Sequence, residues 1–449
     1  MRIRFWGTRG SLAKPGPSTL RYGGNTSCVE ARTADGTLVV LDCGTGAHAL
    51  GLALTARDDG HRGHLLITHT HWDHIQGFPF FAPLFEAGNE WDIYAPGGLG
   101  RRLEETLSGQ MDYTYFPLTL EHLGATIRYH DLAEGAFPID GVRVVTRFLN
   151  HPALTLGYRL ESRGAVVVYA TDHEPHARDP GEVAGWAGAA ALPVHQEDRR
   201  HIEFLAGADL VIHDAQYTRE EYPARVGWGH SPAEYVVDMA LTAKARRLAL
   251  THHAPLRDDE ALDRIVDVCR RRVATAGGTL EVFGAAEGQA FEFAEHAAAV
   301  TERGEAPPVE APPETPAGGV RRTVLVVDDN PEIVGVLVEA LRPEGFRMLT
   351  APDGETALRI ARTERPDLIL LDWILPGCDG LTVCRALRAD GDARLRDVPV
   401  VLLTAQTGTD HISAGFAAGA TDYVTKPFRI AHVRSRVRGW LLRAGAGPA

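Results

Sequence analysis

Seven residues that can bind metal ions follow short apolar runs in the first part of the chain. They are His69, His71, Asp73, His74, His151, Asp172 and His252. The first four fall within six positions, directly after the run HLLIT. Together the seven could hold two divalent ions bridged by a carboxylate and a water. A set of nitrogen and oxygen ligands suits Zn²⁺ first, and also Mn²⁺ or Fe²⁺.

Two such ions favour phosphoryl transfer. Metals about 3.5–4 Å apart can stabilise both the attacking and the leaving oxygen, and a metal-bound water can ionise near pH 7 to give a hydroxide nucleophile. The leaving oxygen then needs a proton. His230, in the turn GWGHSP, is the expected general acid, and His213 and Asp214 could either orient it or simply end a strand.

A helix is predicted to begin directly after His230. Ser231 and Glu234 have the spacing of a capping box, with Pro232 at the first helical position. The partial positive charge at that helix end would favour an anionic substrate nearby.

A second group of reactive side chains lies in the last part of the chain. Asp328 and Asp329 close the run TVLVVDD, and Asp372 closes DLILLD. Thr404 ends VPVVLLTA, and Lys426 ends TDYVTKP. Carboxylates with a hydroxyl and an ammonium group are what Mg²⁺-assisted phosphoryl transfer to an aspartate requires.

The elements that must position these side chains are short β-strands. In the front part, five β-rich runs end in polar residues and helical patterns fall between some of them, which predicts a mixed α/β sandwich. In the rear part, five strands are each followed by a helical segment, which predicts a doubly wound parallel sheet. Residues 294–321, rich in Pro, Ala and Glu, read as a linker between domains at 1–293 and 322–443.

The charge of the chain is unevenly distributed. The net charge is −13 over 449 residues. Residues 321–449 hold 17 basic and 16 acidic residues, which leaves 29 basic and 43 acidic residues before them. An acidic front part disfavours capture of a nucleic-acid backbone.

Apolar runs and cysteines indicate the compartment. No apolar run is long enough to cross a membrane, and the N-terminus has no signal-peptide core. Five scattered cysteines give no disulfide pattern, so a cytoplasmic protein is expected.

The HxHxDH motif at residues 69–74 resembles that of the metallo-β-lactamase-fold hydrolases, which implies an αββα sandwich over most of residues 1–293. The segments IRFWGTRGS, YGGNTSCVE and LDCGTG resemble the phosphodiesterase branch, which includes tRNA 3′-processing ribonucleases and phosphoribosyl cyclic phosphodiesterases. The nuclease branch carries a similar HS turn with a proton-donor role, which supports His230.

The resemblance also implies a distribution of the ligands. One metal would be held by His69, His71 and His151. The other would be held by Asp73, His74 and His252, with His253 as the competing choice for His252. Asp172 would bridge the two metals and Asp42 would be structural. Asp73 and His230 are then the expected catalytic residues.

The rear part resembles the response-regulator receiver domain, a flavodoxin-like (βα)5 fold, over nearly all of residues 323–443. The resemblance implies that Asp372 is the phosphoacceptor and that Mg²⁺ is bound by Asp328, acting through water, by Asp329 and Asp372, and by the carbonyl of Ile374. It further implies that Thr404 and Lys426 contact the phosphoryl group and that Tyr423 is the switch aromatic. Trp373 departs from the usual smaller aliphatic residue after the acceptor.

The predicted function is a two-component response regulator with a dinuclear metal-dependent phosphodiesterase output. Its expected partners are a sensor histidine kinase or phosphotransfer protein, a small phosphodiester substrate and a second copy in a homodimer. No helix-turn-helix follows residue 443, so DNA binding is not expected. The alternatives are an endoribonuclease like the tRNA 3′-processing enzymes, which the charge disfavours, a hydrolase of carboxylic substrates, and a non-catalytic signalling platform.

Overall fold

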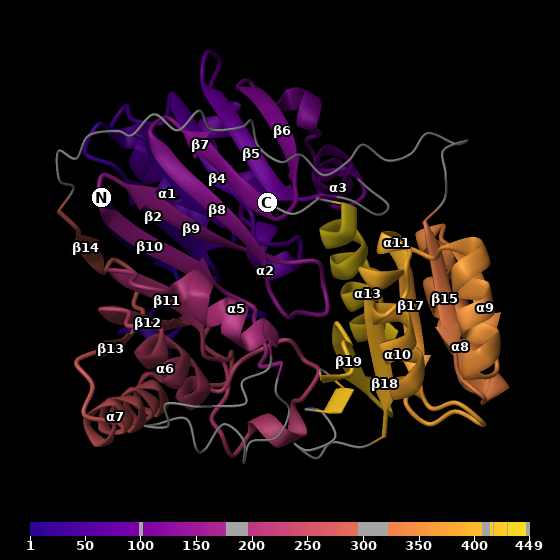
Figure 1. The fold of residues 1–449 in the computed structure, drawn as a ribbon. Coiled ribbons are helices and arrows are strands. Elements are labelled where there is room, and N and C mark those ends of the chain that lie inside the picture. The colour runs from indigo at the N-terminus through magenta and orange to yellow at the C-terminus, as the bar shows by residue number, and fades with distance from the viewer. Residues whose placement is uncertain are drawn as a thin grey trace. The chain divides into compact units, whose positions relative to one another are not determined.

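The computed structural model describes residues 1–97, 102–176, 196–294, 322–405, 414–415, 417–428 and 430–445. The chain forms two compact units, Met1–Pro312 and Pro313–Ala449 (Figure 1). The predicted linker at 294–321 lies outside the described residues except at its first position. None of the helices in the described ranges has the length and hydropathy needed to cross a membrane.

The first sheet of the N-terminal unit has seven strands in the order β14-β1-β2-β3-β4-β5-β6. Their bounds are β1 Arg2–Gly7, β2 Cys28–Arg32, β3 Leu38–Leu41, β4 Arg62–Leu66, β5 Glu90–Pro96, β6 Thr126–Leu132 and β14 Ala290–Glu292. Strands β3 to β6 run parallel to one another, whereas β14, β1 and β2 are paired antiparallel.

The second sheet also has seven strands, in the order β13-β12-β11-β10-β9-β8-β7. Their bounds are β7 Gly135–Ile139, β8 Val142–Phe148, β9 Leu156–Ser162, β10 Ala165–Ala170, β11 Leu210–Asp214, β12 Arg247–Thr251 and β13 Glu281–Gly284. Strands β10 to β13 are parallel. Their carboxyl ends therefore reach the same edge of the sheet.

Helices cover the outer face of each sheet. They are α1 Gly46–Ala56, α3 Leu103–Gln110, α5 Gln196–Leu205, α6 Ala233–Thr242 and α7 Asp259–Thr275, and the short helix α2 Trp72–Ile75 lies in the loop after β4. Leu50 of α1 and Trp91 of β5 share one buried core, and Val236 of α6 and Val266 of α7 share another. The sheets face each other, since the Tyr158 hydroxyl of β9 donates to the Ile67 carbonyl after β4 at 2.6 Å. This is the expected αββα sandwich.

The C-terminal unit is a five-stranded parallel sheet in the order β16-β15-β17-β18-β19. Its elements are β15 Thr323–Val327, α8 Pro331–Leu341, β16 Arg347–Ala351, α9 Gly354–Glu364, β17 Leu368–Asp372, α10 Gly380–Arg388, α11 Ala393–Arg396, β18 Val400–Thr404, β19 Asp422–Thr425 and α13 Ile430–Gly445. The doubly wound receiver fold is confirmed. Strands β15, β17 and β18 are buried throughout, as expected for the centre of such a sheet.

Candidate metal centre and phosphoacceptor site

The HxHxDH motif forms the loop after β4 and the short helix α2. His71 is the residue before α2, and Asp73 and His74 lie within it. The side chains of His69 and His74 are buried, whereas His71 is exposed. The motif therefore presents three imidazoles and a carboxylate from one turn of chain, and the cluster opens to solvent on the side of His71.

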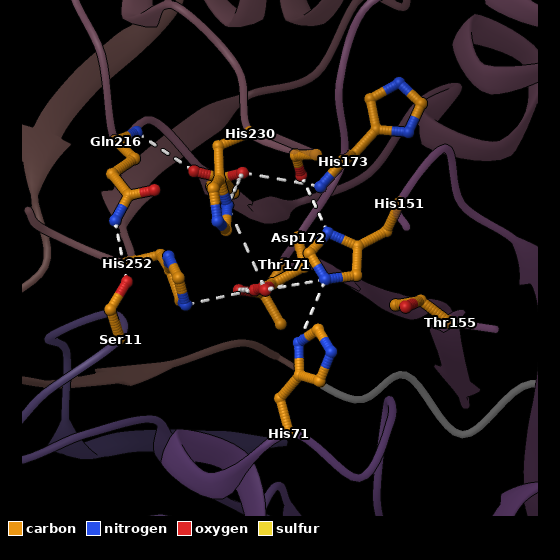
Figure 2. A network of polar contacts seen from close by, with 12 residues as sticks. Ser11, His71, His151, Thr155, Thr171, Asp172, His173, Gln216, His230 and His252 are labelled. Carbon is orange, nitrogen blue, oxygen red and sulfur yellow. Dashed lines mark hydrogen bonds and ion pairs between the residues drawn. The ribbon is translucent and has the colours of Figure 1, made fainter. Parts of the chain in front are cut away.

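Asp172 lies between two groups of these ligands (Figure 2). One of its carboxylate oxygens is 3.6 Å from His69 Nε2 and 3.7 Å from His151 Nε2. The other oxygen is 3.3 Å from His74 Nε2 and 3.1 Å from His252 Nε2. One carboxylate thus faces both groups, each through a different oxygen, which is the arrangement of a bridging ligand.

The two groups are those expected from the resemblance. His69, His71 and His151 converge with Asp172, and Asp73, His74 and His252 form a separate set of ligand atoms within 4.8 Å of one another. A third set of Asp172, His230 and His252 overlaps the second.

The spacing of the nitrogen atoms fits metal ions. His151 Nε2 is 3.2 Å from His71 Nδ1, and His74 Nε2 is 3.3 Å from His252 Nε2. Tetrahedral zinc with Zn–N bonds of about 2.0–2.1 Å separates its ligand atoms by about 3.3–3.4 Å. His69 Nε2 is also buried and has no hydrogen-bond partner among the residues that the structure describes. A buried nitrogen without a partner is costly unless something else satisfies it.

The ionisation of these side chains also suits cation binding. Burial lowers the pKa of His69 well below its usual value and that of His151 to about 3, so both imidazoles keep a lone pair for a ligand bond. Burial opposes a charge on His74, yet Asp73, Asp172 and Asp42 outweigh it and raise its pKa. These carboxylates favour a positive charge at this point, as a bound cation would supply.

Asp42, at the end of β3, orients His74. Its carboxylate accepts the Nδ1–H of His74 at 2.8 Å, the backbone N–H of Thr68 at 2.7 Å and the hydroxyl of Tyr169 at 2.8 Å. Because Nδ1 is held in this way, Nε2 of His74 points into the cluster. A carboxylate behind a ligand histidine is the usual outer support of a metal site.

The structure separates the two members of the His252-His253 pair. His252 Nε2 lies 3.1 Å from Asp73, inside the cluster, whereas His253 Nε2 bonds to the carbonyl of Ala285 at 2.9 Å. A Cβ atom at Gly10 would lie 2.2 Å from the His252 ring. The Gly10 backbone therefore packs against His252, where a larger residue would displace the ring.

Three residues of the centre have left-handed backbone conformations. Asp42 has φ 58°, Asp172 has φ 61° and His252 has φ 58°. Each follows or ends a buried strand and turns its side chain back toward the space between the sheets. This region is unfavourable for residues other than glycine, although Asp and His are found there more often than most.

His230 lies beside the cluster with Asp214 behind it. Its Nδ1 is 3.1 Å from an Asp214 oxygen and 3.9 Å from Asp172. Burial disfavours the imidazolium, but Asp214 outweighs it and raises the pKa of His230 to about 9. With Nδ1 bonded to Asp214, Nε2 is left to exchange a proton with a ligand.

The predicted capping box is wrong. Helix α6 begins at Ala233, with Pro232 as its N-cap and no side-chain cap. The Ser231 hydroxyl donates instead to the His173 carbonyl at 2.6 Å, and Glu234 accepts the backbone N–H of Arg219. Because both side chains form tertiary hydrogen bonds, neither of them caps the helix.

Sequence reasoning missed Glu174, whose side chain is buried. Its carboxylate accepts the Tyr222 hydroxyl at 3.0 Å and the backbone N–H groups of Gly227 at 2.5 Å and Gly229 at 2.9 Å. It therefore holds the turn that leads to His230. The available signal was its place two residues after Asp172, in the polar string TDHE that follows a buried strand.

The receiver unit gathers its acidic residues at the carboxyl ends of β15 and β17. Asp328, Asp329 and Asp372 bring oxygens within 4.8 Å of one another. Lys426 Nζ lies 2.6 Å from Asp328 and 3.0 Å from Asp372. Burial raises the pKa of Asp372, whereas for Lys426 the two carboxylates outweigh burial and raise the pKa.

The remaining predicted receiver residues lie on neighbouring strands of the same sheet or in the turn after β17. Thr404 ends β18 and is buried, and Tyr423 lies in the neighbouring strand β19 and is also buried. Ile374 follows the acceptor strand and its side chain is exposed. The predicted phosphoacceptor and its expected contacts thus come from four adjacent strands, β15, β17, β18 and β19, and the turns that follow them.

Comparisons with known proteins agree with this architecture. The chain is 46% identical over 130 residues to the DNA-binding response regulator MtrA of Mycolicibacterium smegmatis, a match that covers 29% of this chain and 55% of that protein. The chain spans about half the length of the curated relatives it matches.

Two solved structures resemble the N-terminal unit. The metallo-β-lactamase fold protein YhfI from Bacillus subtilis is 17% identical with a TM-score of 0.45, over 65% of this chain and 99% of that chain. The short form of human tRNase Z is 19% identical with a TM-score of 0.45, over 66% of this chain and 100% of that chain.

Two family matches divide the chain in the same way. Residues 37–253 match the beta-lactamase superfamily domain, and residues 324–438 match the response regulator receiver domain. The chain therefore joins a beta-lactamase superfamily domain to a C-terminal response regulator receiver domain.

Proposed function

We propose that the N-terminal domain is a dinuclear metal-dependent phosphodiesterase that the receiver domain regulates. The observation that carries this proposal is Asp172, whose two oxygens face two separate groups of histidines while the His230-Asp214 pair lies alongside. Two divalent ions, with Zn²⁺ as the first choice, would be held by the residues of these groups. Such ions would stabilise negative charge on the phosphoryl oxygens, and they would lower the pKa of a bound water.

The side chains of the protein would then bind, orient and move the proton. Asp42 holds the ring of His74, and the Gly229 carbonyl holds the ring of His151 at 3.0 Å. His230 keeps its Nδ1–H on Asp214 and can deliver a proton from Nε2 to the leaving oxygen. A small phosphodiester, such as a cyclic nucleotide or another cyclic phosphate, fits an acidic domain better than a long RNA does.

The receiver domain would control this activity through Asp372. A sensor histidine kinase or a phosphotransfer protein would supply the phosphoryl group. Asp328, Asp329, Asp372 and the carbonyl of Ile374 would hold Mg²⁺, with Thr404 and Lys426 on the phosphoryl oxygens. We take the two domains to be residues 1–293 and 322–443. Phosphorylation would change either the docking of the receiver domain on the N-terminal domain or the homodimerisation of the chain.

A direct test uses the full chain loaded with stoichiometric Zn²⁺ or Mn²⁺. Hydrolysis of bis(p-nitrophenyl) phosphate and of 2′,3′- and 3′,5′-cyclic nucleotides is measured with and without beryllofluoride, and the same assays are run on Asp172→Asn. We expect turnover by the wild-type chain, a loss in Asp172→Asn, and a rate that differs with beryllofluoride.

The other outcomes separate the alternatives. Metal-loaded protein that cleaves none of these compounds would overturn the phosphodiesterase proposal and leave a signalling platform. Cleavage of structured RNA with a steep salt dependence would favour an endoribonuclease. Equal rates with and without beryllofluoride would remove control by the receiver.

A further inference from the structure

Residues 10 and 11 lie against the second group of metal ligands. The backbone of Gly10 packs against the His252 ring, as described above. The backbone N–H of Ser11 donates to a carboxylate oxygen of Asp73 at 2.6 Å, and the same oxygen lies 3.1 Å from His252 Nε2. The backbone of Ser11 is therefore one hydrogen bond away from an oxygen of the candidate ligand set.

Ser11 has an unfavourable backbone conformation at this place. Its φ is 63°, in the left-handed region that favours glycine. Ser11 is exposed, whereas Asp73 and His252 are buried. Such conformations persist where surrounding contacts fix them, and they concentrate at sites that bind ligands. Ser11 therefore offers a hydroxyl to solvent directly beside two buried members of the ligand set.

Gln216 holds the side chain of Ser11. Its amide Nε2–H donates to Ser11 Oγ at 3.1 Å, and its backbone N–H donates to Asp214 at 2.9 Å (Figure 2). Asp214 also bonds to Nδ1 of His230 at 3.1 Å. Gln216 thus connects the proposed proton donor and its carboxylate to the serine that lies beside Asp73.

The hydrogen-bonding capacity of this pair is only partly used. Gln216 is 4% exposed, and its Oε1 is buried without a hydrogen-bond partner among the residues that the structure describes. A buried polar atom without a partner is costly and calls for a reason, such as a role in binding a ligand. Ser11 Oγ already accepts a hydrogen from Gln216, and no residue in the described ranges accepts the hydrogen of its hydroxyl. That hydrogen is available to a ligand.

We propose that Ser11 binds the substrate by donating its hydroxyl hydrogen to a nonbridging phosphoryl oxygen, and that Gln216 positions this hydroxyl. The inference rests on the proposed phosphodiesterase function and adds a residue that contacts the anionic part of the substrate. Ions held by Asp73 and His252 would attract the phosphoryl oxygens, which are therefore the part of the substrate nearest to Ser11. While Nε2–H of Gln216 donates to Oγ, the hydroxyl hydrogen of Ser11 is kept for the substrate. Loss of a hydrogen bond to a charged oxygen changes affinity by about 10- to 150-fold.

Ser11→Gly tests the hydroxyl separately from the backbone contact. Glycine removes Oγ, keeps the N–H that bonds to Asp73 and favours the left-handed backbone. Binding of inorganic phosphate to the Zn²⁺-loaded full chain is measured by calorimetry without Mg²⁺, and Zn²⁺ content by atomic absorption. In Ser11→Gly, phosphate affinity should fall about 10- to 150-fold while Zn²⁺ content stays unchanged.

Two further variants control this measurement. Ser11→Asn tolerates the left-handed backbone and offers an amide donor, so it should restore part of the phosphate affinity. Ser18→Gly removes an exposed hydroxyl from the same segment and should bind phosphate as the wild-type chain does.

A double-mutant cycle tests the positioning role of Gln216. Gln216→Met removes the amide donor but keeps the length of the side chain and the backbone N–H on Asp214. It should weaken phosphate binding when Ser11 is present and have little further effect in Ser11→Gly. Equal effects of Gln216→Met with and without the Ser11 hydroxyl would overturn the positioning role.

The results distinguish this inference from the proposed function. Phosphate affinity that falls in Ser11→Gly, in a chain whose wild type cleaves no phosphodiester, would keep the Ser11 contact and overturn the phosphodiesterase. Hydrolysis of bis(p-nitrophenyl) phosphate by the wild type, with phosphate affinity unchanged in Ser11→Gly, would overturn the contact and keep the phosphodiesterase. The contact would also be overturned by an equal loss in Ser18→Gly, by a proportionate loss of Zn²⁺ in Ser11→Gly, or by a wild-type chain that binds no phosphate.

Discussion

Replacement of Glu174 by glutamine tests whether one buried carboxylate fixes the turn that ends at His230. Glu174 accepts hydrogen bonds from Tyr222, Gly227 and Gly229. Glutamine keeps one acceptor oxygen, so its amide group would face at least one of these donors. A buried donor without an acceptor costs about 1–3 kcal/mol, and a hydrogen bond to a charged group contributes about 1.5–3 kcal/mol. The expected loss of stability is about 2–4 kcal/mol.

Differential scanning calorimetry of the full chain measures this loss. For a large domain each kcal/mol shifts Tm by about 2 °C, so the transition of the N-terminal unit should fall by about 4–8 °C while that of the receiver unit stays unchanged. Because Gly229 also supports His151, metal affinity should fall about 10–100-fold. Glu281→Gln, which changes a glutamate that is 59% exposed, is the control. Unchanged Tm and metal affinity in Glu174→Gln would refute the reasoning.

Three further substitutions separate the roles of other residues. His230→Ala should lower kcat by about 10²–10⁴-fold while metal content, measured by atomic absorption, stays at the wild-type level; a proportionate loss of metal would argue against a proton-transfer role. Asp42→Asn should weaken metal binding by about 10–100-fold, measured by chelator competition, because the support of His74 is reduced; unchanged affinity would contradict that support. Asp372→Asn should abolish the mass increase that acetyl phosphate causes in the wild-type chain, whereas Asp379→Asn should not; a retained increase would place the acceptor elsewhere.

The polar residues at the strand ends could be predicted because buried parallel strands give a recognisable pattern in the sequence. Short apolar runs that stop at a polar residue marked β10, β11, β12 and β17, and the carboxyl ends of neighbouring parallel strands meet at one edge. Asp172 and Asp372 follow from that pattern. The strand-end pattern could not decide between His252 and His253, because adjacent residues at a strand end can each turn inward. The ring contacts decide it, since His252 Nε2 lies 3.1 Å from Asp73 whereas His253 Nε2 bonds to the carbonyl of Ala285.

Residues that act through tertiary hydrogen bonds were not predictable. Ser231 has the spacing of a capping residue, yet its hydroxyl is taken by the His173 carbonyl from another strand end. The only local signal for Glu174 is its place two residues after Asp172, since the three donors described above come from a turn 48 to 55 residues away in sequence. Buried tertiary hydrogen bonds override local capping preferences, because an unpaired buried polar group costs more free energy than the loss of a helix cap.

The left-handed conformations of Asp42, Asp172 and His252 set a conflict between stability and activity. A non-glycine residue in this region costs about 1–2 kcal/mol, so glycine at any of the three would relax the backbone while removing the functional side chain. At Asp42 that gain is outweighed, because three buried donors would lose their acceptor at a cost of about 1–3 kcal/mol each. A library selected only for thermal stability should therefore drift toward glycine at Asp172 and His252, and lose metal binding. Stabilisation of this domain is better sought in the sheets and outer helices than around the candidate metal centre.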